Sequence, residues 1–262
     1  ARAPQHGGPA PRPPVPGLLR GQPPQRRAGG AGGLVHADAP LAVIGGVGGN
    51  IAPVEGPVIK GGSTNDDRPT ISGTGGNAGE KVAIYDNGVK IGETDVNPDG
   101  SWSFTPGPNT QGWPEKLDDI AHKIEAKNVD GAGNESGPPE AFEFTVDTES
   151  PTQAVGFSYA EDNVDSAGNA STAIETIGNN GHTNDRTPKL VGTLNEGLAA
   201  DETLYIERQR PDGTWERLGE ANVGGAAGNL TWSYQDSLGA DGSYTYRAVL
   251  EDDAGNQPLV QP

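Results

Sequence analysis

The chain has 262 residues and a formal net charge of -18 at pH 7, with 41 Gly, 23 Pro, 5% aromatic residues and neither Cys nor Met. This composition excludes a disulfide framework and thiolate chemistry, and the negative charge argues against a general nucleic-acid binder, which needs a basic face. No apolar run approaches the length of a membrane span. So much Gly and Pro predicts short strands and many turns, while the missing initiator Met and signal peptide predict a fragment of a longer chain.

Residues 1–49 differ in composition from the rest of the chain. They are rich in Pro and Gly, with one acidic residue, Asp38, and five arginines: Arg2, Arg12, Arg20, Arg26 and Arg27. Such a segment buries too little apolar surface to offset the entropy of ordering, so we expect disorder. A linker, or an upstream region translated out of frame, accounts for this composition. A Pro-rich partner ligand is the alternative, although no PxxP pattern with flanking aromatics supports it.

Two motifs recur in residues 50–262 and indicate two copies of one unit. Thr-Asn-Asp-x-x-Pro occurs at 64–69 and 183–188, each time just before an apolar run. Asp-x-Ala-Gly-Asn occurs at 130–134 and 252–256, each time at the end of a run that alternates apolar and polar residues. The function therefore has to be read from a repeated module and not from a single active site.

The first unit, residues 50–148, contains six predicted strands separated by turn residues. They lie at 70–73, 80–86, 90–95, 101–105, 122–128 and 141–146. Asn87-Gly88 predicts a tight hairpin, because these residues accept a positive φ at low cost. Trp102 and Phe104 share one face of their strand, as the two-residue period requires. Short strands at this spacing predict an antiparallel sandwich, and no segment before Asn50 matches an opening strand.

The second unit, residues 149–262, repeats this pattern with differences. Its predicted strands lie at 154–160, 189–193, 203–208, 215–218, 230–234 and 244–251, with a hairpin at Arg210–Thr214. An insertion occupies 165–181. The chain reaches Pro262 soon after the second Asp-x-Ala-Gly-Asn motif, so the last strand of this unit is expected to be short or missing.

The order of motifs in residues 50–262 carries a family resemblance. In the first unit the series is Thr-Asn-Asp-x-x-Pro, Ile84-Tyr85-Asp86-Asn87-Gly88, Asp99-Gly100-Ser101-Trp102-Ser103-Phe104, Asp-x-Ala-Gly-Asn, and Val146-Asp147-Thr148 before Pro151. It resembles the bacterial immunoglobulin-like repeats of large secreted adhesins. The second unit departs from the pattern at the Asn-Gly hairpin and at its insertion. The resemblance implies an all-β chain of tandem Ig-like antiparallel β-sandwiches. It also implies a bacterial cell surface or secreted location, type I secretion, a role in biofilms, and calcium at the joints.

Acidic and amide residues concentrate in loops that this topology places at the ends of the modules. Stacking two sandwiches brings the distal loops of the first against the proximal loop of the second. The residues expected at this joint are Asp66, Asp67, Asp118, Asp119, Asp147, Asp252, Asp253 and Asn256. A second cluster is expected at the far end of the second unit, from Asp162, Asn163, Asp165, Asn184, Asp185 and Asp241. Crowded carboxylates repel one another unless a cation bridges them, and Ca²⁺, with about six to eight oxygen ligands, suits an irregular site.

Turn formation is the competing interpretation for each of these residues, because Asp and Asn side chains bond to nearby backbone. Asp95-x-Asn97-x-Asp99 illustrates it. The spacing copies the first half of an EF-hand loop, yet its twelfth position is Pro106, so we expect a hairpin turn.

The sequence favours a non-catalytic spacer of a surface adhesin that calcium makes rigid. Neighbouring Ig-like repeats of the same chain are the expected partners, with a host or surface receptor bound by a distal region outside this chain. No Gly-x-Ser-x-Gly elbow and no His spacing typical of metal sites is present. A carbohydrate-binding accessory module of a secreted polysaccharide-degrading enzyme is the alternative, and it requires an exposed row of aromatics. Trp102 and Trp232 are expected to be buried, and Trp113 and Trp215 partly exposed.

Overall fold

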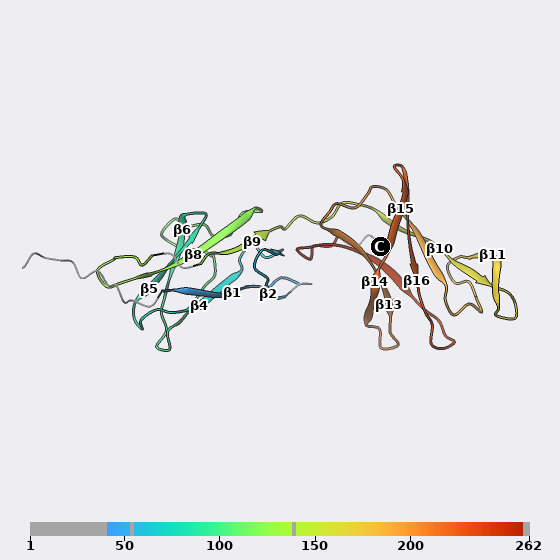
Figure 1. The fold of residues 1–262 in the computed structure, drawn as a ribbon, viewed down its shortest axis with the longest axis horizontal. Helices are drawn as coiled ribbons and strands as arrows, with labels where there is room; N and C mark the ends of the chain where they lie inside the picture. Colours follow the sequence, from blue (N-terminus) through green and yellow to red (C-terminus); the bar gives the residue numbers. More distant parts are fainter. Residues whose placement is uncertain (1–40, 53–54, 138–139, 259–262) are drawn as a thin grey trace, which may run out of the picture. The chain divides into compact units, whose positions relative to one another are not determined.

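The computed structural model describes residues 41–52, 55–137 and 140–258, and all regular elements in these ranges are β-strands (Figure 1). The first sandwich contains β1 (Val43–Gly49), β2 (Gly56–Val58), β3 (Ser63–Thr64), β4 (Thr70–Thr74), β5 (Lys81–Asp86), β6 (Val89–Asp95), β7 (Ser101–Phe104), β8 (Ala121–Val129) and β9 (Phe142–Val146). The second contains β10 (Val155–Val164), β11 (Ala170–Ile177), β12 (Lys189–Leu194), β13 (Glu202–Gln209), β14 (Trp215–Glu220), β15 (Asn222–Ala226), β16 (Asn229–Gln235) and β17 (Tyr246–Asp252). The predicted all-β fold of antiparallel sandwiches is confirmed. These ranges contain no helix long and apolar enough to cross a membrane.

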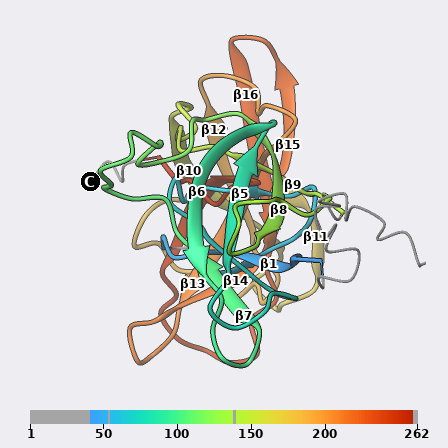
Figure 2. The ribbon, with the colours of Figure 1, turned by 90° about the vertical axis from the view of Figure 1, so that its left-hand side faces the viewer.

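The first sandwich has two sheets, ordered β2-β1-β4-β7 and β3-β9-β8-β5-β6. All neighbours are antiparallel except β3 and β9, which run parallel with Thr64 opposite Val146. β5 and β6 form a hairpin and lie side by side in Figure 2. Its turn residues, Asn87 and Gly88, have φ values of 48° and 81°, as the Asn-Gly pair predicts.

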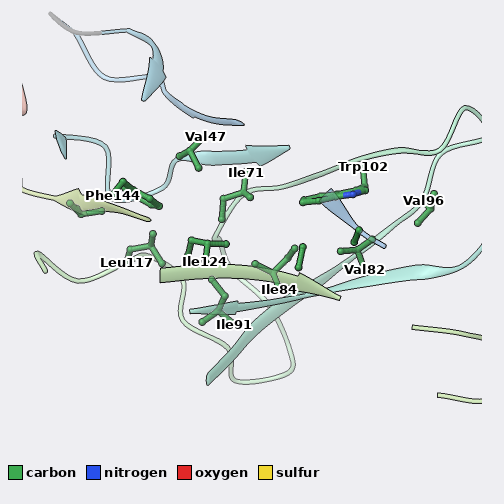
Figure 3. Close-up of a cluster of buried hydrophobic side chains, with 13 residues drawn as sticks. Val47, Ile71, Val82, Ile84, Ile91, Val96, Trp102, Leu117, Ile124 and Phe144 are labelled. Atoms are coloured by element: carbon green, nitrogen blue, oxygen red, sulfur yellow. The ribbon is translucent and has the colours of Figure 1, made fainter. Parts of the chain in front are cut away.

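The core of the first sandwich is made where the two sheets face each other. Every second residue of each strand points inward, so alternate apolar positions meet in the middle (Figure 3). The buried side chains are those of Ala42, Val47, Ile71, Val82, Ile84, Ile91, Val96, Trp102, Leu117, Ile124, Ala126, Phe144 and Val146. Both sheets contribute, and burial of this surface is the main force that holds them together.

A Trp packed on a Gly recurs in both sandwiches. Trp102 lies opposite Gly73 and Trp232 opposite Gly192 in the strand registers. The Trp side chains are 2% and 1% exposed, which confirms their predicted burial. The indole N–H of Trp102 donates to the carbonyl of Thr74 at 3.2 Å, and that of Trp232 to the carbonyl of Gly156 at 3.1 Å. The glycine is needed because any Cβ there would overlap the indole ring.

The second sandwich is built from sheets ordered β11-β10-β12-β16-β15 and β14-β13-β17. Its buried core is smaller and consists of Leu190, Leu194, Leu204, Ile206, Trp232 and Leu250. The predicted hairpin at Arg210–Thr214 is present, with the Arg210 N–H 2.7 Å from the Thr214 carbonyl and Gly213 at φ 86°. Among the residues described, no strand follows β17.

The structure corrects the expected start of the first sandwich. Disorder was predicted through residue 49, with no opening strand, but residues 43–49 form β1 between β2 and β4. Four of the seven residues of β1 are Gly, which weakens the strand signal in the sequence. β1 is stabilised instead by hydrogen bonding to the strands on both of its edges and by the burial of Val47, which is 2% exposed. Residues 1–40, also predicted to be disordered, lie outside the described residues.

Candidate functional site

The Asp-x-Ala-Gly-Asn loops have the same internal geometry wherever they occur. In the loop at 252–256, Asp252 Oδ1 accepts the backbone N–H groups of Ala254 and Asn256 at 2.9 and 2.8 Å, and Asp252 Oδ2 accepts Asn256 Nδ2 at 2.9 Å. Gly255 adopts φ 87° to close the turn. The loop at 130–134 repeats these bonds. The motif is therefore a turn that satisfies its own polar groups.

A third copy of this loop lies at 165–169, inside the predicted insertion. Asp165 Oδ1 accepts the backbone N–H groups of Ala167 and Asn169, each at 2.9 Å, and Gly168 has φ 80°. The loop connects β10 to β11, so the insertion extends the sheet by a hairpin. The sequence Asp-Ser-Ala-Gly-Asn could have shown this turn, because it matches the motif at every fixed position.

The loop at 252–256 differs from the other two in what it touches. Its Asn256 Nδ2 also donates to the backbone carbonyl of Asp147, 2.8 Å away, at the end of β9. Asp252 and Asn256 are each 8% exposed and Ala254 is 1% exposed, whereas Asn134 and Asn169 are exposed. The proximal loop of the second sandwich is thus buried against the segment that leaves the first. Asn256 and Asp147, both expected at the joint, are therefore in contact, while their role as ligands stays a prediction.

The surroundings of Asp147 at this junction disfavour the ionised form of its carboxyl. Burial raises the pKa of its carboxyl above the ordinary value. A hydrogen bond from the Glu149 N–H, 3.1 Å from Asp147 Oδ1, opposes the shift. Nearby negative charges raise the pKa further; they belong to Asp252, Asp119 and Asp201. The first two were predicted at the joint, but Asp201, in the loop between β12 and β13, was not, since no motif marks it.

Asp66 and Asp185 hold equivalent positions in the two sandwiches and have a clear local role. Asp66 Oδ2 accepts the backbone N–H of Asn50 at 2.8 Å, and its Oδ1 accepts that of Arg68 at 2.8 Å. Likewise, Asp185 Oδ2 accepts the backbone N–H of Asn163 at 3.4 Å, and its Oδ1 accepts that of Thr187 at 2.6 Å. Each carboxylate, 3% exposed, ties the end of an opening strand to the Thr-Asn-Asp loop.

The other predicted ligands of the joint are distributed around it. Asp67 pairs with Lys116 at 3.1 Å, and Asp119 Oδ2 accepts the Thr148 hydroxyl at 2.7 Å. Asp118 is exposed, with its carbonyl 2.8 Å from His122 Nε2, and Asp253 is exposed.

The far cluster of the second sandwich is joined mainly through hydroxyl and amide groups. The Thr183 hydroxyl donates to Asp162 Oδ2 at 2.7 Å, and Thr183 Oγ1 accepts the Asp185 N–H at 2.8 Å. Asn184 Nδ2 donates to the Asp165 carbonyl at 2.8 Å, and Asp241 pairs with Arg186 at 2.7 Å. The loops predicted to meet here are therefore linked by shared contacts.

Residues 59–148 match the model of the bacterial Ig-like domain family. The match covers β3 to β9 and about a third of the chain, and it begins after β1 and β2. No curated protein matches the chain. The bacterial Ig-like domain is a structural module that is typically without catalytic activity.

The loops near Asp147, at the end of the segment that matches the bacterial Ig-like domain, have one feature of a calcium site and lack another. In the described ranges, no group of three or more His, Asp or Glu side chains is arranged as a metal-binding set. However, Asn65 Oδ1 is buried without a hydrogen-bond partner, in the loop next to Thr64, whose carbonyl accepts the Asp147 N–H at 2.9 Å. An unpartnered buried oxygen is the kind of donor that Ca²⁺ takes. The calcium site therefore stays a prediction.

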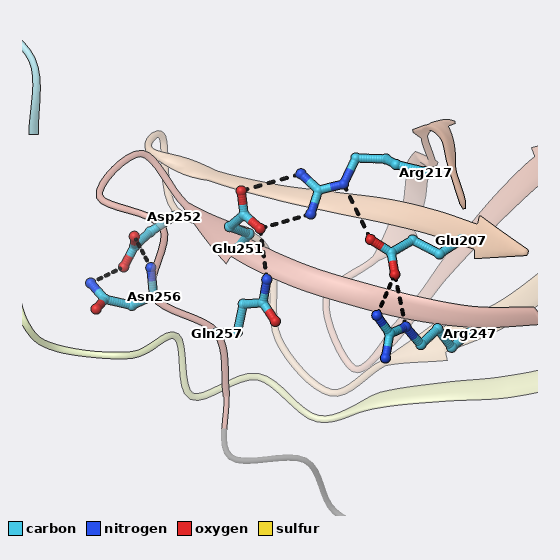
Figure 4. A network of polar contacts seen from close by, with 7 residues as sticks. All are labelled: Glu207, Arg217, Arg247, Glu251, Asp252, Asn256 and Gln257. Carbon is cyan, nitrogen blue, oxygen red and sulfur yellow. Dashed lines mark hydrogen bonds and ion pairs between the residues drawn. The ribbon is translucent and has the colours of Figure 1, made fainter. Parts of the chain in front are cut away.

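Charged side chains cover the aromatic residues on the sheet β14-β13-β17. Arg217 lies 4.0 Å from the ring centre of Tyr205, and Arg247 lies 4.4 Å from that of Trp215. Both guanidinium groups bind Glu207, which is 7% exposed, at 3.3 and 2.8 Å (Figure 4). Sugar binding needs bare aromatic faces, so the described part of this sheet lacks the feature required by the carbohydrate-binding alternative.

Proposed function

We propose that the two sandwiches act as non-catalytic spacer modules of a bacterial cell-surface adhesin, of the type I secreted, biofilm-associated kind. The observation that carries this proposal is the partly buried contact between Asn256 and the Asp147 carbonyl. A free linker would leave both groups in water. A partly buried hydrogen bond next to the buried Ala254 would restrain the hinge between the modules.

Calcium is the ion that suits the junction in this proposal. The negative charges of Asp252 and Asp119 lie close enough to Asp147 to raise the pKa of its carboxyl. A divalent cation would offset the repulsion between these carboxylates, because it favours the ionised form of every carboxylate near it. The candidate ligands are the carboxylates of Asp119, Asp147 and Asp252 and the side-chain oxygen of Asn65. They are not arranged as a metal-binding set in the described structure, so an ion would have to draw them together. Its chemistry is structural: a bound ion adds a restraint to the hinge.

The same arrangement gives the partner surface at the other end of the first module. Its loop at 130–134 has the internal bonds of the loop at 252–256, but its Asn134 is exposed. A preceding Ig-like repeat of the same polypeptide would cover it as residue 147 covers Asn256. The receptor would then be bound by a distal region outside this chain, on a host or another surface.

Small-angle scattering and thermal unfolding of the 262-residue chain test the proposal. Both are measured with CaCl₂, with MgCl₂ at equal ionic strength, and with chelator. Ca²⁺ is expected to raise the unfolding midpoint and narrow the distribution of intramolecular distances, and Mg²⁺ is expected to do much less. Asp147→Asn should abolish the calcium response while keeping the bond from the Glu149 N–H.

Asp212→Asn is the matched control. It removes the same charge from an exposed turn in the second sandwich, where Asp212 Oδ1 accepts the Thr214 N–H at 2.9 Å. The control should respond to Ca²⁺ as the wild type does. Scattering that is unchanged by Ca²⁺ in the wild type, or an equal response in Asp147→Asn, would contradict the calcium part of the proposal. Similar repeats on either side of this piece in the complete gene product would support the spacer role independently.

A further inference from the structure

A hollow of about 310 Å³ lies between the edges of the two sheets of the first sandwich. Its lining comes from three places: β6, β7 and the loop that follows β7, at residues 107–114. β6 and β7 are each the outermost strand of their described sheet. Sites for small ligands typically measure about 300–1,000 Å³, so the hollow has the size of a small site of this kind.

Trp113 lines this hollow and differs from the other tryptophans of the chain. Trp102 and Trp232 are buried and donate their indole N–H groups to backbone carbonyls. Trp215 is partly exposed, but Arg247 covers its ring. Trp113 is partly exposed, as the sequence predicts; among the described residues no aromatic ring or cation packs on its indole, and no acceptor takes the indole N–H. Both the ring face and the N–H are therefore accessible.

The loop fixes Trp113 through a single side chain, that of Asn109. Asn109 Oδ1 accepts the backbone N–H groups of Gln111 and Trp113 at 3.1 and 3.0 Å. Its Nδ2 donates to the carbonyls of Gly107 and Trp113 at 3.1 and 2.9 Å. Because the position of Trp113 is set in advance, a ligand would lose little affinity to ordering of the loop.

The edge of β6 brings backbone hydrogen-bonding groups to the hollow. The Val96 N–H bonds to the Glu80 carbonyl at 3.0 Å, and in an antiparallel ladder such bonded pairs recur at every second residue. Thr94, opposite Val82, therefore bonds to β5. The N–H and C=O groups of Glu93 point the other way, toward the free edge, and Glu93 lines the hollow.

The edge of β7 contributes in the same way. The Gly75 N–H bonds to the Gly100 carbonyl at 3.1 Å, so the alternation directs the backbone groups of Ser103 away from β4. The Thr94 hydroxyl donates to the Ser103 carbonyl at 2.6 Å, which agrees with this direction. Within the part of the chain that the structure describes, the Ser103 N–H has no such partner. Polar backbone groups of two sheet edges thus lie around a hollow that has an accessible indole in its lining.

This combination of groups suits a sugar. One face of a sugar ring consists of C–H groups and stacks on an aromatic ring, while its hydroxyls both donate and accept, as free N–H and C=O groups require. The lining also includes apolar side chains that would cover the ring, those of Ile91, Phe104, Pro108 and Pro114. The charge of the chain, -18, disfavours a sugar that carries a carboxylate or sulfate.

We propose that the hollow binds the terminal sugar of a neutral glycan, with the ring on Trp113 and the hydroxyls on the backbone groups of Glu93 and Ser103. This binding activity goes beyond the spacer role. It depends on neither calcium nor the junction, so its failure would leave the spacer proposal standing.

The second sandwich lacks the features that make this site. The counterpart of the loop between β7 and β8 is the loop between β16 and β17, at residues 236–245, which is shorter and contains no Trp. Its aromatic residue, Tyr244, has the Arg208 guanidinium 5.7 Å from its ring centre. Sugar binding is therefore expected in the first sandwich alone, and the second serves as an internal control.

An extended peptide fits the hollow less well than a sugar. The Thr94–Ser103 bond joins the edges of β6 and β7, and it would obstruct a strand laid between them. A proline-rich peptide needs no strand pairing, but it docks on grooves with several aromatic side chains, and Trp113 is the one accessible indole of this lining. Binding of such a peptide in place of a sugar is an outcome that contradicts the proposal.

The indole N–H signals of the 262-residue chain in NMR spectra give the test. The probes are the methyl glycosides of glucose, galactose, mannose and N-acetylglucosamine, each titrated to about 10 mM, a range that suits weak single-sugar binding. At least one should shift the Trp113 signal to saturation and leave those of Trp102 and Trp232 in place. The methyl glycosides of glucuronic and galacturonic acid should bind at least about tenfold more weakly than that neutral sugar.

Two tryptophan variants provide matched substitutions, with affinity measured by calorimetry. Trp113→Ala removes the stacking surface and should weaken binding at least about tenfold. Trp215→Ala removes another partly exposed indole, one that Arg247 covers, and should bind as the wild type does. If Trp113→Ala does not fold, nuclear Overhauser contacts between the sugar C–H protons and the Trp113 indole in the wild type decide the matter.

Three results would overturn the proposal. The first is a Trp113 signal that none of the four neutral sugars shifts. The second is equal binding by the wild type and a folded Trp113→Ala variant, or bound sugar without contacts to the indole. The third is a shift of the Trp113 signal by a hexaproline peptide and not by the sugars.

Discussion

At the scale of single residues, the close contact between Gly192 and Trp232 makes the addition of one methyl group at position 192 destabilising. A Cβ at position 192 would overlap both the Gly156 carbonyl and the indole of Trp232. Gly192→Ala is therefore expected to destabilise the second sandwich by about 1–3 kcal/mol, the usual cost of overpacking. Urea unfolding followed by Trp fluorescence measures this loss.

Gly224→Ala is the control for that substitution. A Cβ at position 224 meets no atom within 4 Å, and the residue lies in the exposed strand β15. Its effect should stay within about 0.5 kcal/mol, as for most surface changes. An equal loss at the two sites would mean that backbone entropy, and not the overlap with Trp232, determines the cost.

His122 gives the first sandwich a pH-dependent contact. Burial lowers its pKa, but the bond from Nδ1 to Asp86 at 2.7 Å and the Asp118 carbonyl outweigh that effect, and the pKa is raised above 6.5. A raised folded-state pKa means that protonation favours folding. The stabilisation is fully present below about pH 6.5 and is lost as the pH rises through the folded-state pKa of His122.

The variant Asp86→Asn isolates this contribution. It removes the charge that favours the imidazolium, so the His122 pKa measured by NMR should fall. The wild type should have a higher melting temperature than the variant, and this difference should increase as the pH is lowered from about 8.5 to about 6. A constant difference across this range would show that the ion pair does not titrate as proposed.

At the scale of elements, the Asp-x-Ala-Gly-Asn loops allow the same substitution in two environments. Asn134→Ala removes bonds within an exposed turn and should cost about 1 kcal/mol or less. Asn256→Ala removes the equivalent bonds and also the donor to the Asp147 carbonyl, in a buried site. Its expected cost is about 1–3 kcal/mol by chemical denaturation. Equal losses would mean that the junction contact contributes nothing.

The strands show what the sequence could and could not predict. Alternation of apolar and polar residues located strands such as β8 and β16, because each has one face in a core. β1 was missed because its four glycines carry no such pattern, and its stability comes from pairing with β2 and β4. Strand pairing depends on distant residues, so local patterns do not reveal it.

The candidate site was predictable in part for a similar reason. Motif order placed Asp147 near Asp252, but no local signal separates a ligand from a residue that caps its own turn. Asp66, predicted at the joint, accepts two backbone N–H groups, and its role as a ligand stays a prediction. Asp201 contributes to the electrostatics of the joint without belonging to any motif. Such roles are set by the tertiary arrangement.

At the scale of the whole molecule, net repulsion should outweigh attraction between surface charges. The chain carries a charge of -18. Several of the ion pairs that oppose this repulsion are exposed, as in Lys60–Glu140, where the side chains are 44% and 87% exposed. Pairs of this kind contribute about 0–1 kcal/mol each and are weakened by salt. Because a large net charge destabilises a compact state, screening should favour folding.

This balance predicts the sign of the salt effect. Raising NaCl from about 0.01 to about 0.15 M shortens the screening length from about 30 to about 8 Å, so the melting temperature at pH 7 should rise. The rise should shrink near pH 4.5, because the sequence pI is about 4.4 and the net repulsion is then almost gone. A melting temperature that falls with NaCl at pH 7 would show that ion pairs dominate over repulsion. Since NaCl screens all charges alike, a further increase with Ca²⁺ at constant ionic strength would isolate the contribution of bound cations.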